Sequence, residues 1–348
     1  MIFFDCERLK HPNTGLYHYC LNLANAMARQ ADRLENRELC VYVHDDKRYL
    51  LDSAVKVKKV RGWERALLYD SRIELWHTAT QLSRYQPFNG RKVVTVHDLN
   101  FLYEPLTEAQ KKRRLEIVKK NLRSCSAIVA ISEFTKSDIL KHLDTCDTQI
   151  EVIYNGCNRY EGEITEPLGK PEGRFIFAVG TILPKKNFHV LPALLVGNDY
   201  RLIIAGIYDS PEYVRQIMDQ ARRFGVGDRV SVPGPVSEGE KHWYLQHCDA
   251  FLHPSIAEGF GLPVIEAMQY GKPVFISNHT SLSEVGGDFA YYFNHDFDPE
   301  AMRKEFTDGM NDFVSGGKKP EDIIRHAESF SWDTAARQYI ELYNRILY

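Results

Sequence analysis

The stretch AFLHPSIAEGFGLPVIEAM, residues 250–268, contains the pattern that decides the fold. It opens with a short apolar run typical of a strand, passes through a glycine-containing loop and ends in a helical pattern. Pro263 suits the first turn of that helix, because the fixed φ of proline matches a helix and its missing N–H is not needed there. Gly259 and Gly261 let a ligand approach the backbone closely, and the free amides at the positive helix end form a cradle for an anion.

Two carboxylates stand eight residues apart in this stretch, Glu258 in the loop and Glu266 in the predicted first turn of the helix. Carboxylates so placed can accept hydrogen bonds from vicinal hydroxyls on two parts of one ligand. The structural alternative stays open. In that alternative Glu266 only complements the helix dipole, and Glu258 is a solvated loop residue.

The same alternation of strand and helix continues through both halves of the chain. Several strands are continuous apolar runs, as expected when helices cover both faces of a sheet. The pattern predicts an α/β fold with two doubly wound parallel sheets. The predicted strands are 1–4, 39–43, 74–77, 92–97, 127–131 and 151–153, and then 175–179, 201–205, 229–232, 250–252 and 273–276; helices are predicted over 16–29, over 108–123 and, after the N-cap Ser331, to the end of the chain.

Length and charge both divide the chain in two. A length of 348 residues favours two domains, and the glycine- and proline-containing segment 155–174 has no apolar period, so it is the predicted linker. Residues 1–160 hold 26 Lys and Arg against 20 Asp and Glu, whereas residues 161–348 hold 18 against 27. We therefore predict domains at 1–160 and 161–330 with different partners, and a terminal helix at 331–348.

Composition excludes several classes of protein. With 44% hydrophobic and 12% aromatic residues the chain is not disordered, and a net charge of −3 does not suit a nucleic-acid binder. The seven cysteines form no CxxC pair, which argues against a disulfide framework or zinc knuckle and favours a reducing compartment. No signal segment and no apolar stretch of about 18 residues is present, so a cytoplasmic protein is expected, with peripheral contact at the inner face of the cytoplasmic membrane left open.

Three further candidates lie where predicted strands end. Lys185 and Lys186 follow the strand 175–179 and can neutralise a pyrophosphate, although a solvated lysine pair is the commoner case. His97 ends the strand 92–97 at a sheet edge where ligands bind; it could donate to a substrate hydroxyl or bond only to the backbone, and no spacing marks it as a metal ligand. Gly15 stands at the turn before the helix 16–29, where it either admits a ligand or makes a tight turn.

The helix 108–123 carries seven basic residues against two acidic ones. A solvated face is the ordinary explanation of such a cluster. The alternative is contact with anionic lipid headgroups or with a lipid-linked phosphate acceptor. RNA binding has no supporting aromatic platform. The basic residues on one flank are Lys112, Arg113, Lys119, Lys120 and Arg123.

Taken together, five ordered segments resemble the retaining glycosyltransferases of family 4, including those of bacterial polysaccharide and lipopolysaccharide synthesis. EGFGLPVIE at 258–266 resembles the E-x7-E motif of the family, and VGTILPKKN at 179–187 resembles its phosphate-binding loop. TVHDLNFLY at 95–103 resembles an acceptor-side loop. AISEFT at 130–135 and VIYNG at 152–156 resemble the end of the N-terminal domain.

This resemblance implies the GT-B fold, in which two Rossmann-like domains face each other across a cleft and the final helix crosses back to the N-terminal domain. It implies that the N-terminal domain binds a glycan or lipid-linked glycan acceptor, and that the C-terminal domain binds a UDP- or GDP-hexose. The implied reaction transfers mannose or glucose with retention of configuration. No cofactor is expected, because lysines and backbone amides can stabilise a leaving diphosphate without a metal.

The resemblance also implies roles for single residues. Glu258 would contact hydroxyls of the donor sugar, Glu266 the ribose, and Lys186 the diphosphate. His97 would line the sugar pocket, and the backbone at Pro235 and Val236 would contact the base. The catalytic set is then His97, Glu258 and Lys186, and the donor-binding set is Gly15, Lys185, Lys186, Glu258, Gly259, Phe260, Gly261, Leu262 and Glu266.

Two rival functions remain for the same fold. One is an enzyme of another kind, a nucleotide-sugar epimerase or a phosphorylase, although no motif marks a pyridoxal lysine. The other is a catalytically idle nucleotide-sugar-binding module. The intact set of Glu258, Glu266, Lys186 and His97 argues against the idle module.

Overall fold

The computed structural model describes the chain except for residues 13, 54, 66–67, 105 and 146–147. It forms two compact units. Unit 1 comprises Met1–Gly156 together with Phe330–Tyr348, and unit 2 comprises Cys157–Ser329. Each unit is built on one sheet whose described strand pairs are all parallel, which confirms the predicted α/β class with two doubly wound sheets.

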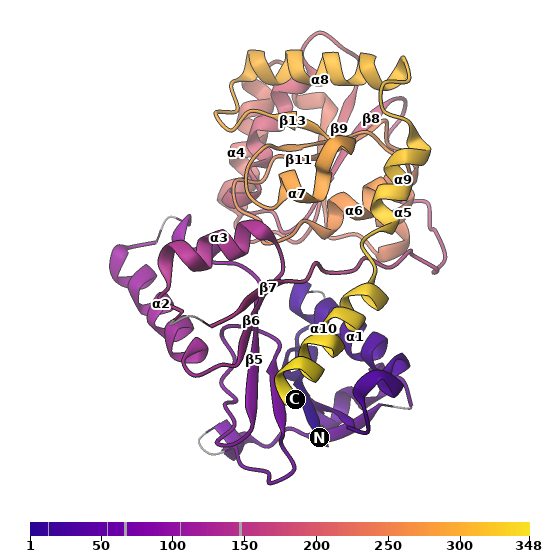
Figure 1. The fold of residues 1–348 in the computed structure, drawn as a ribbon. Helices are drawn as coiled ribbons and strands as arrows, with labels where there is room; N and C mark the ends of the chain where they lie inside the picture. Colours follow the sequence, from indigo (N-terminus) through magenta and orange to yellow (C-terminus); the bar gives the residue numbers. More distant parts are fainter. Residues whose placement is uncertain (13, 54, 66–67, 105, 146–147) are drawn as a thin grey trace. The chain divides into compact units, whose positions relative to one another are not determined.

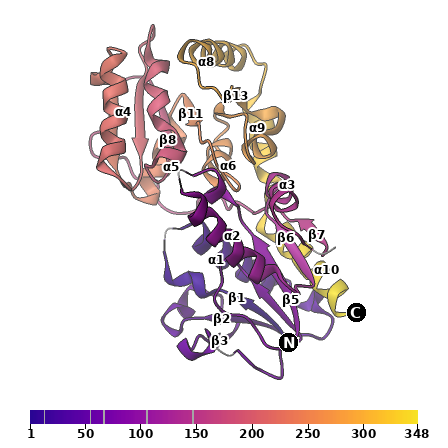
Figure 2. The ribbon, with the colours of Figure 1, turned by 90° about the vertical axis from the view of Figure 1, so that its left-hand side faces the viewer.

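The unit 1 sheet has the strand order β3-β2-β1-β4-β5-β6-β7. Figure 2 shows β1, β2 and β3 side by side at one end of this sheet and β6 and β7 at the other. The strands are β1 Ile2–Asp5, β2 Leu39–Val43, β3 Lys56–Lys59, β4 Leu75–Thr78, β5 Arg91–Val96, β6 Ala127–Ala130 and β7 Ile150–Val152. The helices are α1 Gly15–Arg29, α2 Glu108–Leu122, α3 Glu133–His142 and α10 Trp332–Leu347.

Both faces of this sheet are buried. In β1, Phe4 packs into a cluster with side chains of α1 and α10, whereas Phe3 points to the other face and packs against Trp76. A strand covered on both faces needs apolar residues at every position, which explains the continuous apolar runs in the sequence. The last helix, α10, lies alongside α1 (Figure 1) and thereby joins the end of the chain to unit 1. Ser331 caps it, as predicted, by accepting a hydrogen bond from the Asp333 N–H.

The unit 2 sheet has the order β10-β9-β8-β11-β12-β13. Its strands are β8 Phe175–Val179, β9 Arg201–Ala205, β10 Val230–Gly234, β11 Ala250–His253, β12 Val274–Ser277 and β13 Tyr291–Phe293. Its helices are α4 Pro211–Arg223, α5 Glu238–His247, α6 Leu262–Met268, α7 Leu282–Gly286, α8 Pro299–Val314 and α9 Pro320–Glu328, with 3-10 turns at Pro184–Lys186 and Phe188–Leu195.

The sequence patterns miss two strands, β3 and β13. Both lie at an edge of their sheet. The β3 sequence KVKK puts charged side chains where a central strand would be apolar, which is how edge strands avoid unwanted pairing. Strands β2, β8 and β9 match the predicted ranges, and the others differ from them by one or two residues at one or both ends. Within the described ranges, none of the helices combines the length and the apolar character that a membrane crossing requires.

Candidate active site

The best-defined cluster lies where β8 and β11 end in unit 2. These strands pair in parallel, so the loops that follow them start at the same edge of the sheet. A backbone hydrogen bond of 2.9 Å from the Ile256 N–H to the Lys185 carbonyl ties one loop to the other. Asn187 adopts a left-handed conformation with φ of 58°, which ends the short turn carrying Lys185 and Lys186. The two loops therefore form one fixed platform.

Glu258 is the centre of this platform. Its Oε1 accepts a hydrogen bond from the Lys186 ammonium. The same oxygen lies 2.7 Å from His253 Nε2 and 3.0 Å from Ser255 Oγ. All three of these bonds reach Oε1, so within the described residues Oε2 keeps its capacity to accept hydrogen bonds from a ligand. The structure thus brings together two of the three predicted catalytic residues, Glu258 and Lys186.

Electrostatics hold this cluster in one protonation state. Burial alone would disfavour the Glu258 carboxylate, but the Lys186 charge and the hydrogen bond from His253 outweigh burial and keep the pKa of Glu258 well below its usual range. Burial and the Lys186 charge lower the pKa of His253, so its imidazole is neutral. The neutral ring donates its Nε2–H to Glu258, and its Nδ1 has no hydrogen-bond partner among the described residues.

Sequence reasoning missed His253 and Ser255. The signal was available, because His253 is a polar residue directly after the apolar run 250–252, the same kind of position at a strand end that marked His97. The pattern ended the strand at residue 252, whereas β11 includes His253 and buries it completely.

The glycine-containing loop after Glu258 is fixed by contacts with residues 281 and 282. Gly261 has a φ of 107°, which an L-residue rarely adopts, and a Cβ there would lie 2.7 Å from Leu282 Cδ2. Phe260 is buried. Ser281, which the sequence did not mark, donates from its buried hydroxyl to the carbonyls of Glu258 and Phe260, both at 3.2 Å. The predicted donor-binding residues Gly259, Phe260, Gly261 and Leu262 thus form a fixed, glycine-dependent turn before α6.

Glu266 is separate from the Glu258 cluster. Helix α6 begins at Leu262, so Glu266 stands in its second turn, and the prediction of a first-turn position is wrong. Pro263 does lie at the start of the helix, as predicted. The Glu266 carboxylate lies 3.0 Å from Lys241 Nζ, on the neighbouring helix α5. Lys241 was not identified from the sequence as a partner of Glu266.

The base-contact candidates lie beside this second carboxylate. Pro235 and Val236 connect β10 to α5, the helix that carries Lys241. Pro235 is exposed and Val236 half-buried. Ser237 closes this connection as the N-cap of α5, in a capping box with Glu240.

His97 lies in unit 1, where β5 ends. Its Nε2 lies 2.9 Å from the Ala79 carbonyl, so Nε2 carries the hydrogen and donates it. Burial lowers the pKa of His97 to about 4, so the ring is neutral at pH 7. Its remaining nitrogen, Nδ1, can only accept. The backbone-bonded alternative describes its Nε2, and a role of His97 toward a substrate hydroxyl stays a prediction.

Gly15 starts α1, directly after the N-cap Thr14. It is exposed, and among the described residues, its chain neighbours and the nearby backbone of its own helix aside, no heavy atom lies within 4 Å of the position a Cβ would take. The space beside it is open to a ligand, although the described contacts do not require glycine there.

The basic flank of α2 is partly neutralised. Lys119 lies 3.1 Å from Glu116, while Lys112, Arg113, Lys120 and Arg123 are exposed and form no ion pair with another described residue. Elsewhere in the described part of the chain, no three His, Cys, Asp or Glu side chains gather in the way a metal ion needs.

Comparisons with known proteins identify the class of this fold. Sucrose-phosphate synthase from Thermosynechococcus elongatus superposes with a TM-score of 0.74, at 17% identity and over 99% of this chain and 98% of that one. HepE from Anabaena, solved with UDP and glucose, superposes with a TM-score of 0.68 at 18% identity, over 99% of both chains. The fold is that of the GT-B glycosyltransferases.

Family models then cover both halves. The model described as "Glycosyl transferases group 1" matches residues 161–330, and "Glycosyltransferase Family 4" matches residues 15–159. O-antigen chain mannosyltransferase B of Escherichia coli is 25% identical over 98% of this chain and 99% of its own length. O-antigen chain mannosyltransferase RfbU of Salmonella typhimurium is 29% identical over 60% of this chain and 58% of its own length. The chain belongs to the family 4 glycosyltransferases and is an enzyme of the hexosyltransferase class.

Proposed function

We propose that the enzyme transfers mannose or glucose from a UDP- or GDP-sugar to a glycan or lipid-linked glycan acceptor in the synthesis of a cell-surface polysaccharide. The cluster of Lys186, His253 and Glu258 carries the proposal, because it offers a cation for a diphosphate next to a carboxylate oxygen for sugar hydroxyls. The O-antigen mannosyltransferase names of the relatives favour mannose.

In the proposed reaction the anomeric configuration is retained. The acceptor hydroxyl oxygen forms its bond to the anomeric carbon on the face from which the diphosphate departs, and the hydroxyl proton passes to the departing phosphate. Lys186 stabilises the charge that develops on the diphosphate, and Glu258 orients the sugar through its hydroxyls. We propose that no metal is needed, because Lys186 and Lys185 supply positive charge at the sheet edge.

A second carboxylate site completes the donor side of the proposal. Glu266, held by Lys241 on α5, accepts from the two ribose hydroxyls, and the backbone at Pro235 and Val236 contacts the base. In unit 1, His97 accepts a hydrogen bond from a substrate hydroxyl through Nδ1.

Membrane contact is a separate part of the proposal. Ile117 of α2 is 43% exposed, and around it are basic side chains that are exposed and form no ion pair within the described part of the chain: Lys112, Arg113 and Lys120 on α2 and Arg123 directly after it. Basic side chains with an exposed apolar residue suit the surface of an anionic bilayer. Such contact would bring a lipid-linked acceptor to unit 1.

The first experiment identifies the donor. UDP, GDP, UDP-glucose and GDP-mannose are compared for the rise they produce in thermal stability, because a ligand that binds the native state raises its melting temperature. The stabilising donor is then incubated with and without an acceptor extract, in buffer containing EDTA. We expect an acceptor-dependent product with the α linkage of the donor. Free or epimerised sugar from the donor alone would instead support the epimerase.

The second experiment tests the site. Glu258→Gln and Lys186→Ala should each lower transfer by one to several orders of magnitude. Lys304→Ala is the matched control, because Lys304 forms an exposed ion pair with Asp308 on α8, in the same unit. Near-normal transfer by both site variants contradicts the site assignment.

A further inference from the structure

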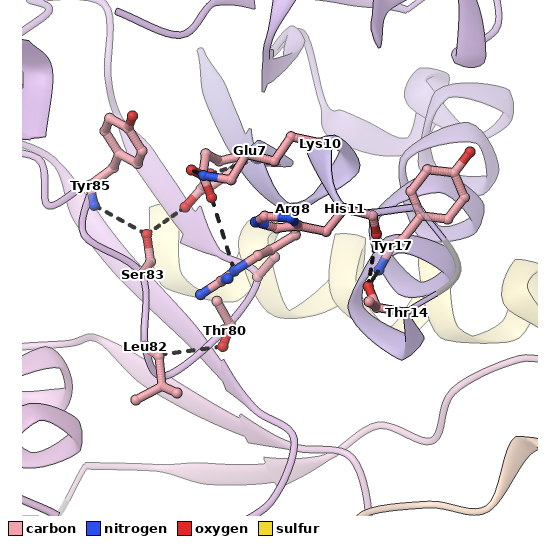
Figure 3. Close-up of polar contacts among 12 residues, drawn as sticks. Glu7, Arg8, Lys10, His11, Thr14, Tyr17, Thr80, Leu82, Ser83 and Tyr85 are labelled. Carbon is pink, nitrogen blue, oxygen red and sulfur yellow. Dashed lines mark hydrogen bonds and ion pairs between the residues drawn. The ribbon is translucent and has the colours of Figure 1, made fainter. Parts of the chain in front are cut away.

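A group of charged and polar side chains in unit 1 has no role in the site described so far. The loop between β1 and α1 carries Glu7, Arg8 and Lys10, and the segment after β4 carries Thr80 and Ser83 (Figure 3). Both segments leave the carboxyl edge of the same parallel sheet, because β1 and β4 are neighbours. His97, at the end of β5, stands at this edge too.

The two segments are fixed to each other and to His97. Ser83 Oγ donates to Asp5 Oδ2 at 2.7 Å, which ties the second segment to the end of β1. Gln81 accepts from the His97 N–H at 3.2 Å, and His97 donates to the Ala79 carbonyl. The amide of Asn121, on α2, reaches the carbonyls of Gln81 and Ser83 at 2.7 and 3.1 Å.

Arg8 is only weakly paired within this group. Its side chain is 29% exposed and makes no hydrogen bond to another described residue. Its nearest carboxylate is Glu7, with 4.0 Å between Arg8 Nε and Glu7 Oε2, and Glu7 already accepts a hydrogen bond from Lys10. A guanidinium has five N–H donors. Because the Arg8 guanidinium is partly buried and its described carboxylate partner lies at the 4.0 Å limit of an ion pair, it keeps donors that can bind two oxygens of an oxyanion.

The carboxylates of this group are more buried than its two cations. The carboxylates of Asp5 and Glu7 are buried, with side-chain exposure of 11% for Glu7, whereas Arg8 and Lys10 are each 29% exposed. Asp5 points inward to Ser83 and the Glu7 N–H. The Arg8 charge is felt at both Asp5 and His97, where it acts to lower each pKa, so Arg8 lies close to both.

We propose that Arg8 binds an oxyanion of the acceptor, a phosphate or a carboxylate, and so positions the acceptor hydroxyl beside His97. The proposal rests on the proposed glycosyl transfer and names its acceptor class as anionic. Arginine suits this task because its planar fork fits two oxygens of one anion, and the partly buried edge strengthens the attraction.

The first test does not depend on activity. The Nε–H resonance of Arg8 is followed by NMR while inorganic phosphate, or acetate in a parallel titration, is added at constant ionic strength. We expect a saturable shift that is absent from Arg8→Gln and retained in Arg84→Gln, which removes an exposed arginine from the second segment. A response to phosphate alone indicates a phosphate-bearing acceptor, and a response to acetate alone a carboxylate. Failure of both anions to shift the resonance overturns the proposal.

The second test uses transfer by the wild-type enzyme. Arg8→Gln should raise the KM for an anionic acceptor at least tenfold and leave the KM for a neutral analogue and the affinity for the nucleotide unchanged, with partial rescue by Arg8→Lys. Equal losses on anionic and neutral acceptors, or weaker nucleotide binding, overturn the proposal. Absence of transfer by the wild type to any acceptor counts against the glycosyltransferase proposal instead, and the phosphate titration still decides the anion site.

Discussion

Lys186 and Glu258 are 72 residues apart in the sequence, yet they form an ion pair whose side chains are only 13% and 14% exposed. The pair joins the loop after β8 to the loop after β11. Both groups are also the ones proposed to meet the donor substrate. Without a ligand, each neutralises the other.

Removing one partner of this pair should destabilise unit 2. Lys186→Ala leaves the Glu258 carboxylate buried with only neutral donors, and loss of one partner of a buried pair costs about 3 kcal/mol. Urea unfolding of Lys186→Ala, Glu258→Gln and the double variant measures the coupling. We expect the double variant to lose less than the sum of the two single losses. The exposed-pair variant Lys304→Ala should stay close to the wild type, and additive losses would contradict a coupled pair.

The pairing of Lys186 with Glu258 also shows where sequence reasoning stops. Apolar runs that end in polar residues marked both loops, because the carboxyl ends of parallel strands carry functional side chains. Their adjacency depends on β8 and β11 being neighbours in the sheet, although two strands intervene along the chain. The hydrophobic periodicity of the sequence does not reveal the order of the strands in the sheet.

Two other residues show the same limit in different ways. The hydrogen bond from His97 Nε2 to the Ala79 carbonyl, on which the proposed acceptor role of Nδ1 depends, is a contact that no motif reports. Ser281 stands after a different strand from the loop it supports, so its bonds to Glu258 and Phe260 depend on tertiary packing. Sequence patterns place residues along elements, whereas these roles arise between elements.

Ser281 should act as a positioning residue for Glu258. Ser281→Ala removes both hydrogen bonds from the buried hydroxyl, and an unmet buried carbonyl costs about 1–3 kcal/mol. The loop should then hold Glu258 less firmly, so we expect kcat to fall about tenfold, because small misplacement of an orienting group is costly. Nucleotide affinity should change little, since Lys186 and Glu266 are retained. Steady-state kinetics with separate kcat and KM values measure this.

Ser283→Ala provides the control for Ser281. The Ser283 hydroxyl is exposed and donates only to the nearby Thr280 carbonyl among its described bonds. The Ser283→Ala variant should have the kcat and KM of the wild type. If Ser281→Ala changes stability without changing kcat, the serine supports the fold but does not position Glu258.

Gly206 should tolerate no side chain. A Cβ at this residue would lie 1.8 Å from the Gly180 carbonyl oxygen, and its φ is 147°. Gly180 precedes the lysine turn, and Lys186 Cε passes near it. Gly206→Ala should therefore destabilise unit 2 by about 2–4 kcal/mol through steric overlap and backbone strain, and should also lower transfer. Thermal unfolding is compared with that of Gly197→Ala, because Gly197 also has a positive φ, of 83°, but has no described heavy atom near the position of a Cβ. Gly197→Ala therefore measures backbone strain without steric overlap.

Acid should weaken unit 1 through His77. This histidine is completely buried between Thr95 Oγ1, 2.8 Å from Nε2, and the Tyr343 hydroxyl, 2.6 Å from Nδ1. Burial lowers the pKa of His77 to about 3, and burial lowers that of His97 to about 4. An unfolded histidine takes up its proton near pH 6.5, so stability is complete above that pH and falls by about 1.4 kcal/mol per pH unit for each such histidine below it.

Urea unfolding followed by far-UV circular dichroism at pH 7, 6 and 5 measures the acid effect. Burial raises the pKa of Asp5 to about 6, so this carboxyl opposes the trend between pH 4 and 6, but one such group does not cancel two histidines. The imidazole resonances of His77 should remain those of a neutral ring down to pH 5. Unchanged stability from pH 7 to pH 5 would falsify the assignment of two buried neutral histidines.

The basic flank of α2 should bind anionic membranes. Each lysine or arginine near an anionic surface contributes about 1 kcal/mol, so reversing Lys112, Lys120 and Arg123 to Glu should weaken binding to phosphatidylglycerol-containing vesicles at least about a hundredfold. Co-sedimentation at low and high salt measures this, because salt screens the attraction within a Debye length of about 10 Å at 0.1 M. The control reverses Arg215, Arg222 and Arg223 on α4, which changes the net charge equally but lies in unit 2. Equal loss in both triple variants would show a response to net charge alone, whereas loss confined to the α2 variant, together with retained transfer to a short soluble acceptor, assigns the membrane contact to this helix.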